Sequence, residues 1–355
     1  MMKIAVIGGG IVGSTTAFYL SQNKDFDVTL FDEGVGQATS AAVGIICPWV
    51  SQRRNKEWYD LVREGAEFYQ PLISDLEDDS FYYNNGTLIF HDTLLDKLEK
   101  IAIKRLPDAP AMKSIKKLSE SEVKELLPDG FTAKEALFVE GGSQIDGKQL
   151  VCLLKDKASR NGIRLEEKKV VVTFENGHYI IDGEVFDGCV MATGAWINQT
   201  MDGLLFDVRP QKGQLIETKI PITHNNFPVL MPKGEIDILI NKEGNVVVGA
   251  SHENDKDFDL NQDEAVIASL IQGAHEWIPE LTRDDVVSIR VGTRAHTSNF
   301  SPFYGPVSSY PHLYVASGLG SSGLTSGPYI GYILAKAFVE EIESWPLHPD
   351  QFRIQ

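Results

Sequence analysis

The sequence predicts an α/β fold with a parallel sheet, joined to an α+β region that is built on an antiparallel sheet. Three observations support this prediction. An apolar run, three spaced glycines and a helical stretch follow one another at the start of the chain. Two further apolar runs, one in Cys189–Trp196 and one near the carboxyl end, each stop at a Gly-containing turn. Between these segments, short strands are separated by Asn-Gly and Glu-Gly turns, which are typical of antiparallel hairpins.

The first element has the spacing of a dinucleotide-binding βαβ unit. Lys3–Ile7 is a short apolar strand, Ile11–Gln22 is helical, and Val28–Phe31 forms a second strand that ends at Asp32. The glycines of the G-x-G-x-x-G pattern allow a tight turn, close approach to a pyrophosphate and close helix packing. The spacing predicts that Gly8, Gly10, Gly13 and Asp32 contact a dinucleotide here. The fold is thus Rossmann-like.

The next segment, "GVGQATSAAVGIICPW", does not continue as the helix and strand of a nicotinamide-binding fold. Its small residues allow the backbone to follow an extended ligand, and Thr39 and Ser40 can donate hydrogen bonds to phosphate. The βαβ pattern by itself fits NAD as well as FAD, so an NAD-dependent dehydrogenase remains an alternative at this point.

The composition restricts the classes of partner. The 355 residues are enough for about two domains. With 33 basic and 50 acidic residues, the formal net charge is −17, which disfavours nucleic acid because such binding neutralises phosphates. Cys47, Cys152 and Cys189 lie far apart and form no metal-binding pattern, so we expect a reduced, cytoplasmic compartment and no metal.

The uncharged stretch Ile4–Asn23 follows Lys3, as a signal peptide or membrane anchor would. However, "GGGIVG" interrupts it, and glycine is costly inside a helix. We therefore interpret the stretch as a strand and a helix and expect no transmembrane segment.

Six motifs in order, "IGGGIVG", "ATSAAVG", "MATGAW", "RPQKGQ", "GTR…SPFYG" and "SGLGSSG", are similar to the FAD-dependent D-amino-acid oxidase family. The resemblance covers nearly the whole chain and is strongest to the glycine oxidase and D-amino-acid dehydrogenase branches. It implies a glutathione-reductase-type FAD-binding domain. It also implies non-covalent FAD, since no cysteine stands at a position that resembles a family flavin-linkage site.

The resemblance further implies which residues lie along FAD. The adenosine and pyrophosphate would lie on Gly8–Gly13, including Ile11 and Val12, and on Asp32 and Glu33. The other matching positions are Thr39, Ser40, Gly44, Ile45, Val170, Thr193, Gly194, Trp196, Gly320, Ser321, Ser322, Gly323 and Leu324. The last five would present backbone N–H groups at the flavin pyrimidine edge, where a helix amino terminus favours negative charge.

Because these segments are scattered, we expect a discontinuous FAD-binding domain over residues 1–75, 145–205 and 290–355. The intervening residues 76–144 and 206–289 would form a substrate-binding domain, with helices near Leu94–Ile103 and Glu264–Glu276.

The resemblance implies that Arg294 holds a substrate carboxylate, because it stands where the family anchors that group. A guanidinium fork fits a carboxylate with two hydrogen bonds. His252 and Tyr304 are further candidates for the pocket. Ala295 replaces a usual proline, Asn299 a frequent aspartate, and Lys212 a common arginine, which leaves the loop conformation and the substrate's size open.

The predicted reaction is oxidative deamination of glycine or a small D-amino acid. The Cα hydrogen leaves as hydride to flavin N5, and the imino acid hydrolyses to a keto acid and ammonia; this step requires no protein general base. The alternatives are an oxidase or dehydrogenase of an N-methyl or cyclic amino acid such as sarcosine or proline, an enzyme acting on a modified tRNA base, and a non-catalytic FAD-binding protein. Oxygen or a quinone would accept the electrons, and a homo-oligomer is compatible with the sequence.

Overall fold

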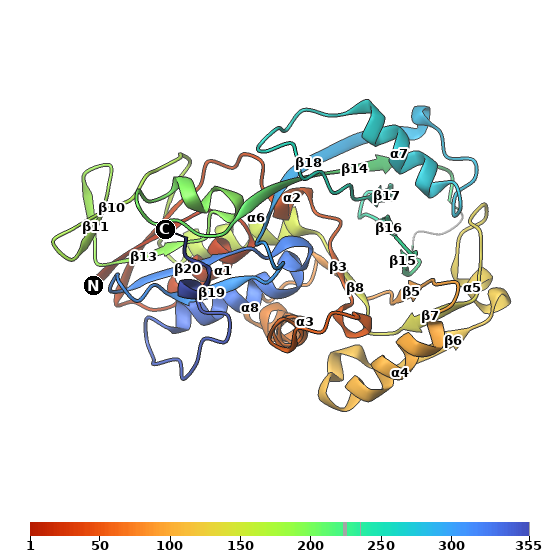
Figure 1. Ribbon diagram of the computed structural model, residues 1–355, viewed down its shortest axis with the longest axis horizontal. Helices are drawn as coiled ribbons and strands as arrows, with labels where there is room; N and C mark the ends of the chain where they lie inside the picture. Colours follow the sequence, from red (N-terminus) through yellow and green to blue (C-terminus); the bar gives the residue numbers. More distant parts are fainter. Residues whose placement is uncertain (223–225, 235, 355) are drawn as a thin grey trace.

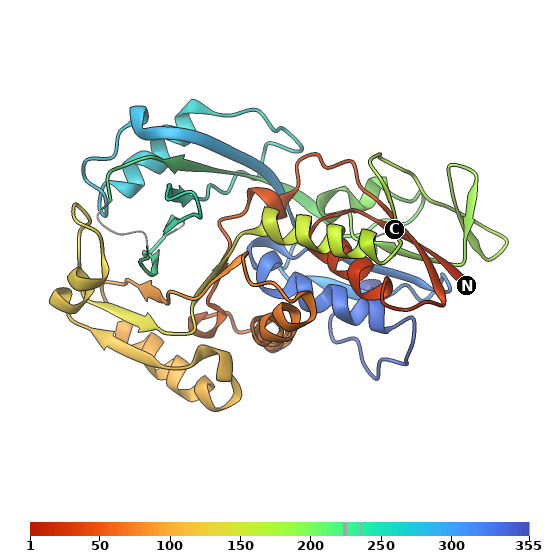
Figure 2. The same cartoon turned by 180° about the vertical axis from the view of Figure 1, so that it is seen from behind.

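The computed structural model describes residues 1–222, 226–234 and 236–354. A six-stranded sheet and an eight-stranded sheet lie toward opposite ends of an elongated molecule, and the long strands β14 and β18 run between the two ends (Figure 1). Figure 2 shows α1, α6 and α8 side by side from behind. The helices are α1 (Ile11–Leu20), α2 (Ala38–Ala41), α3 (Lys56–Leu76), α4 (Leu95–Arg105), α5 (Glu120–Leu126), α6 (Gly147–Arg160), α7 (Glu264–Ala274) and α8 (Gly323–Lys336).

The six-stranded sheet confirms the predicted parallel architecture. Its order is β19 (Phe303–Pro306), β20 (Leu313–Ser317), β13 (Gly188–Met191), β1 (Met2–Ile7), β2 (Phe26–Phe31) and β9 (Arg164–Glu166). All neighbours are parallel except the edge pair β19–β20. Successive residues of β1 point to opposite faces of the sheet, as in any strand. Ile4 and Val6 pack with α1, α6 and α8, whereas Ala5 and Ile7 pack against a small antiparallel sheet. That sheet consists of β10 (Thr173–Glu175), β11 (His178–Ile181) and β12 (Glu184–Phe186).

The eight-stranded sheet is largely antiparallel, as predicted, with one parallel pair between β15 and β5. Its order is β18 (Val286–His296), β14 (Arg209–Thr218), β17 (Val246–Gly249), β16 (Asp237–Ile240), β15 (Val229–Met231), β5 (Thr87–Ile89), β7 (Ala136–Val139) and β6 (Ile115–Leu118). One face packs on α7 through Ile216, Ile238 and Val248. The other face, with Leu215 and Leu239, turns toward Val43 and Ile45 of the nucleotide-binding side.

The two predicted tight turns have different outcomes. The Glu243-Gly244 turn does join a hairpin, because β16 and β17 are antiparallel neighbours with Ile240 opposite Val246. The prediction of a hairpin at Asn85-Gly86 was wrong. The preceding strand β4 (Tyr82–Tyr83) pairs with β8 (Ser143–Ile145), which also pairs with β3 (Ile45–Ile46), whereas the following strand β5 pairs with β7 and β15. Gly86 has φ +81°, so the turn chemistry is present, but it redirects the chain between two sheets.

The predicted domain limits remain a prediction. β18 passes through the limit at residue 290 while it pairs with β14 along its length, and the second-domain range includes residues outside the described part. Among the described residues, no helix is long and apolar enough to cross a membrane, and no group of three or more His, Cys, Asp or Glu side chains could hold a metal ion.

Candidate active site

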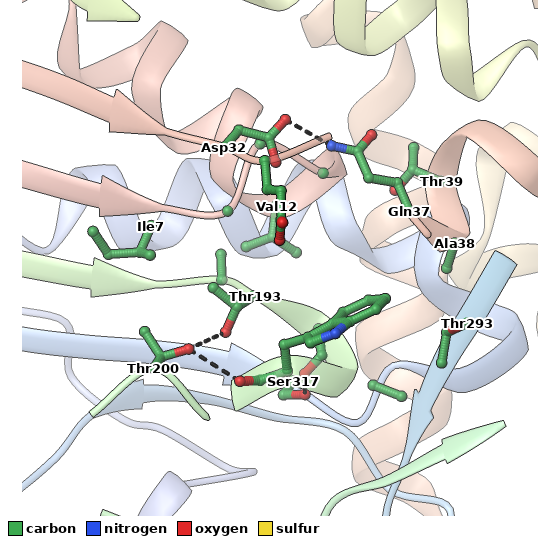
Figure 3. Close-up of a pocket in the computed structure, with 18 of the residues that line it drawn as sticks. Ile7, Val12, Asp32, Gln37, Ala38, Thr39, Thr193, Thr200, Thr293 and Ser317 are labelled. Carbon is green, nitrogen blue, oxygen red and sulfur yellow. Dashed lines mark hydrogen bonds between the residues drawn. The ribbon is translucent and has the colours of Figure 1, made fainter. Parts of the chain in front are cut away.

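A cavity of about 170 Å³ lies at the carboxyl ends of the parallel strands β1, β2, β13 and β20. This is the edge at which open α/β sheets bind ligands. Figure 3 shows Asp32 and Gln37 on one side of the cavity and Thr193, Thr200 and Ser317 on the other. We call this space the nucleotide cavity.

The glycines around the nucleotide cavity fall into two groups. A Cβ on Gly13 would lie 1.8 Å from the carbonyl oxygen of Gly8, and a Cβ on Gly8 would lie 2.5 Å from that of Ala192. These two glycines are required by close packing within the protein. Gly10, Gly194 and Gly320 line the cavity. A Cβ on Gly10 would meet only Thr39 Oγ1, at 3.5 Å, and a Cβ on Gly194 or Gly320 would meet no protein atom within 4 Å. The second group leaves room for a ligand to lie against bare backbone, which fits the pyrophosphate and ribityl parts of FAD.

Asp32 is held in place by two partners that the sequence did not reveal. Its Oδ2 accepts hydrogen bonds from Gln37 Nε2 at 2.7 Å and from Lys155 Nζ at 2.6 Å. Lys155 lies on α6 and its side chain also covers Gly9. Both donors bind the same oxygen of Asp32 and so orient the carboxylate at the cavity wall. A carboxylate at this position can accept hydrogen bonds from ribose hydroxyls.

The opposite wall is also fixed by hydroxyl groups. Thr193 and Thr200 share a hydrogen bond of 2.8 Å between their hydroxyls, and Ser317 Oγ donates to the carbonyl of Gly194 at 2.8 Å. Across the cavity, Thr39 Oγ1 accepts from the N–H of Ile11 at 3.1 Å, in the first turn of α1. These bonds hold both backbone segments that would contact the phosphates.

A second cavity, of about 160 Å³, adjoins the first and shares Ala38, Thr39, Gly320 and Gly323 with it. We call it the substrate cavity. Its polar lining includes Arg294 of β18, His252, Asp237 of β16 and Ser321. Val43, Gly44 and Ile45 line another part of it. The two adjoining cavities together bring most of the predicted cofactor residues close to Arg294, the predicted carboxylate anchor.

Arg294 lies flat across the neighbouring strand. A Cβ on Gly213 of β14 would lie 2.5 Å from Arg294 Nη1, so only glycine leaves room for the guanidinium there. Arg294 Nη1 donates a 2.8 Å hydrogen bond to the carbonyl of Ser251. The guanidinium is therefore positioned by a strand and a backbone carbonyl, and its planar fork has the geometry that recognises an anion through two hydrogen bonds.

Asp237 stands on the same face of the sheet as Arg294. Directly opposite residues in paired strands share a face, and Asp237 pairs with Gly249, Gly249 with Leu215, and Leu215 with Arg290. Side chains alternate between the two faces along a strand, and Arg294 is four residues beyond Arg290 on β18. Arg294 therefore points to the same face as Arg290 and Asp237. Within the described residues, no hydrogen bond or ion pair reaches the Asp237 carboxyl. Burial raises its pKa to about 7.

This shift predicts that replacing Asp237 with asparagine stabilises the protein at neutral pH. Between about pH 4 and pH 7 the folded state retains a proton that the unfolded chain has released, so stability falls as pH rises through this range. At pH 8 we expect Asp237→Asn to raise the free energy of unfolding by about 1–3 kcal/mol, and near pH 4 we expect no difference. Urea unfolding at the two pH values measures this, and equal stabilities at pH 8 would show that the carboxyl is not destabilised by burial.

The segment from Ser251 to Asp263 contacts the walls of both cavities, since His252 lines the substrate cavity and Phe258 touches Trp196 of the nucleotide cavity. Phe258 packs on Trp196, with ring centroids 5.0 Å apart. Lys212, whose side chain is only 1% exposed, donates to Asp259 Oδ2 at 2.7 Å and to the carbonyl of Asn261 at 2.5 Å. Lys212 holds the pKa of Asp259 at about 2. The lysine at the position of a common family arginine thus ties this segment to β14.

We expect Lys212→Met to loosen the segment, because it removes the cation from Asp259 and Asn261 while keeping similar apolar length. The N–H of Glu253, which donates to the carbonyl of Lys212 at 2.9 Å, should exchange with deuterium at least about tenfold faster. Lys256→Met is the matched control, since Lys256 is 46% exposed and lies 3.8 Å from Asp263. Unchanged protection at Glu253 would contradict this role of Lys212.

Most of the predicted site residues gather at the two cavities. The nucleotide cavity is lined by Gly8, Gly10, Ile11, Val12, Asp32, Glu33, Thr39, Val170, Thr193, Gly194, Trp196, Gly320 and Gly323. The substrate cavity is lined by Thr39, Gly44, Ile45, His252, Arg294, Gly320, Ser321, Gly323 and Leu324. Gly13, Ser40, Ser322 and Tyr304 line neither cavity.

The residues outside the cavities have evident local contacts. Ser40 donates to Gln37 Oε1 at 3.1 Å, and Ser322 Oγ accepts from Trp58 Nε1 at 3.3 Å. Tyr304 is buried on β19 and packs edge-on against Trp345, and burial raises its pKa to about 12. The structure therefore does not bring Tyr304 to the substrate cavity. None of the three cysteines lines either cavity, and non-covalent attachment remains the expectation.

The two departures in the Arg294 loop have structural counterparts. Ala295 is buried, lines the nucleotide cavity and pairs with Pro210, so β18 continues to His296. Asn299 Oδ1 accepts hydrogen bonds from Thr297 Oγ1 and from the N–H of Ser301, both at 2.9 Å. Asparagine supplies the acceptor that closes this turn, as an aspartate would.

Comparison with known proteins shows the family to which this chain belongs. A model of the family described as FAD dependent oxidoreductase matches residues 3–337. The uncharacterised oxidoreductase YurR of Bacillus subtilis is 36% identical over 370 residues, covering 98% of both chains. A glycine oxidase of Pseudomonas putida is 26% identical over 343 residues, covering 92% of this chain and 91% of the relative. The crystal structure of iminodiacetate oxidase from Chelativorans sp. BNC1 has a TM-score of 0.89 at 29% identity, covering 98% of both chains. The chain therefore belongs to the FAD-dependent oxidoreductase (DAO) family, a family of enzymes that oxidise amino acids and amines with FAD.

Proposed function

We propose that this protein oxidises a small amino acid at its Cα–N bond, with Arg294 holding the substrate carboxylate. The observation that carries the proposal is the position of the Arg294 guanidinium. It lies across Gly213 in the substrate cavity, next to the glycine-lined nucleotide cavity. A carboxylate bound there would place Cα at the junction of the two cavities.

Bound FAD would supply the hydride acceptor. The chain's own residues bind and orient the cofactor and the substrate. Gly10, Gly194 and Gly320 admit the cofactor against bare backbone, and Arg294 fixes the substrate by its carboxylate. Phe258 packs on the Trp196 wall of the nucleotide cavity, and we expect this contact to limit the access of water from that side. The imine that leaves the site hydrolyses to a carbonyl acid and an amine or ammonia.

A secondary amine is the second candidate substrate, and one comparison favours it. The iminodiacetate oxidase is similar to this chain over 98% of its length, and its named substrate is a secondary amine that carries carboxylates. The same Arg294 would anchor one carboxylate of such a compound. The primary and secondary amines differ only at nitrogen, so the anchor alone does not separate them.

An anaerobic substrate panel tests the proposal. The purified holoenzyme would be mixed with glycine, D- and L-alanine, sarcosine, proline and iminodiacetate, and loss of the flavin's visible absorbance would be followed. We expect reduction by at least one of these compounds. If none bleaches the flavin, the proposed function is wrong. Readmitting oxygen and measuring hydrogen peroxide then separates an oxidase from a dehydrogenase.

A further inference from the structure

We propose that the Asp237 carboxylate accepts a proton from the ammonium group of the bound substrate and so produces the neutral amine. This inference rests on the proposed function, because it assumes a substrate that carries a carboxylate and an ammonium group. It assigns a role to a residue that no sequence motif indicated.

The first support is the position of the carboxyl group. Asp237 lines the substrate cavity together with Arg294, and the strand register puts both residues on one face of the same sheet. An amino acid is a zwitterion, and this face offers it a cation at one place and a carboxyl group at another. Gly213 and Gly292 lie on the same face and line the substrate cavity, where they let the Arg294 guanidinium and Ala41 approach the sheet closely.

The second support is that Asp237 has no structural task among the described residues. No hydrogen bond or ion pair reaches its carboxyl, although the residue is half-buried in the wall of the substrate cavity. A desolvated acid without a partner is costly to keep in a fold. The neighbouring Cys47 does not replace a partner, because burial raises the pKa of its thiol to about 12 and it stays uncharged. A group that stays without a partner inside a cavity is suited to bind what enters the cavity.

The third support is the match between the acid and the reaction. Hydride can leave Cα only when the nitrogen lone pair is free, so an ammonium group must first lose a proton. In the proposed step one N–H bond of the substrate breaks and one O–H bond forms on Asp237; only a proton moves, and no atom changes oxidation state. Burial raises the pKa of Asp237 to about 7, where a general base is effective at neutral pH. Of the described charged and titratable groups near this face, Arg294 binds the carboxylate, Arg290 is paired with Glu217 at 2.9 Å, and His252 lies beyond the end of β17.

The test is the pH dependence of flavin reduction in the wild type and in Asp237→Asn. Both holoenzymes would be mixed anaerobically with glycine, sarcosine and iminodiacetate between about pH 5.5 and pH 10. In the wild type we expect kred/Kd to rise with a midpoint near the pKa of Asp237. In Asp237→Asn the rise should move toward the pKa of the substrate ammonium, near that of an alkylammonium at about 10. The loss should be on the order of 10²-fold at pH 7.5 and below tenfold near pH 10.

Two controls separate proton transfer from a structural effect. Asp92→Asn makes the same chemical change at an exposed carboxylate paired with Lys233 at 3.4 Å, and should leave the profile unchanged. Binding of acetate, which has a carboxylate but no amine, is followed by the change it causes in the flavin spectrum. Acetate should bind equally to wild type and Asp237→Asn, because Arg294 is intact.

Four results would overturn the inference. A uniform loss at every pH, or an unchanged profile, would show that Asp237 does not take the proton. A wild-type rate that falls as pH rises through 7 would show instead that the protonated acid donates to a second carboxylate, a role that asparagine could keep. If no probe reduces the wild-type flavin, the proposed function itself fails, and this inference falls with it.

Discussion

Replacing Arg294 with alanine is expected to lower kcat/KM by about 2–5 kcal/mol of transition-state stabilisation, roughly 30- to several-thousand-fold. The guanidinium lies over Gly213 and is held by the carbonyl of Ser251, so its position is set before the substrate arrives. Removing it leaves the substrate carboxylate without its charged partner in the substrate cavity. That penalty acts on binding and on the placement of Cα, so both KM and kcat should change.

Arg294→Lys separates charge from geometry. Lysine keeps the positive charge but offers a single point rather than a planar fork, so we expect a loss that is smaller than that of alanine and still well above tenfold. Arg283→Ala is the control, because Arg283 forms an exposed ion pair with Glu264 at 3.0 Å and lines neither cavity. If kcat/KM for every active substrate of the panel stays within twofold in Arg294→Ala, Arg294 is not the anchor. FAD content, measured from the flavin absorbance per protein, should be unchanged in all three variants.

Gly10→Val is expected to weaken FAD binding by at least about 10²-fold while leaving the apoprotein folded. Gly10 has φ −74°, a value that valine adopts readily, and a Cβ there would meet only Thr39 Oγ1, at 3.5 Å. The added methyl groups would instead occupy the nucleotide cavity, where the backbone is open to the ligand. The measurement is FAD titration into apoprotein, with circular dichroism to check the fold.

Gly13→Val is the contrasting variant. Its Cβ would lie 1.8 Å from the carbonyl oxygen of Gly8, a backbone atom that cannot move aside without separating α1 from β1. We expect this variant to lose stability rather than cofactor affinity alone, with little folded protein recovered. If Gly10→Val and Gly13→Val behave alike in both folding and FAD binding, the division of the glycines into packing and ligand groups is wrong.

The nucleotide-binding start of the chain could be predicted closely from sequence. The strand, the three glycines, the helix and Asp32 follow one another without long connections, so their spacing along the chain is nearly their spacing in space. The predicted helix ended two residues late, since α1 stops at Leu20, and the predicted first strand began one residue late. Such differences are small because local periodicity determines the type of an element better than its ends.

Contacts between distant segments could not be predicted in this way. The Asn85-Gly86 turn was recognised correctly as a turn, but its strands find partners far along the chain, and turn chemistry does not state which sheet they join. Lys155 meets Asp32 across 123 positions of sequence, and no motif marks it. Tyr304 stands in a motif near Arg294, yet its strand turns the ring toward Trp345.

The sequence alone determined the α/β class, the dinucleotide site and the family, because each depends on residue types at short, ordered spacings. Only the tertiary structure decided that Arg294 lies over Gly213, that Lys212 secures the segment from Ser251 to Asp263, and that Asp237 lines the same cavity as Arg294. These facts depend on the pairing of β14, β16, β17 and β18. A shift of one residue in that register would turn Asp237 to the face that packs on α7, where a carboxyl group would meet only the apolar core.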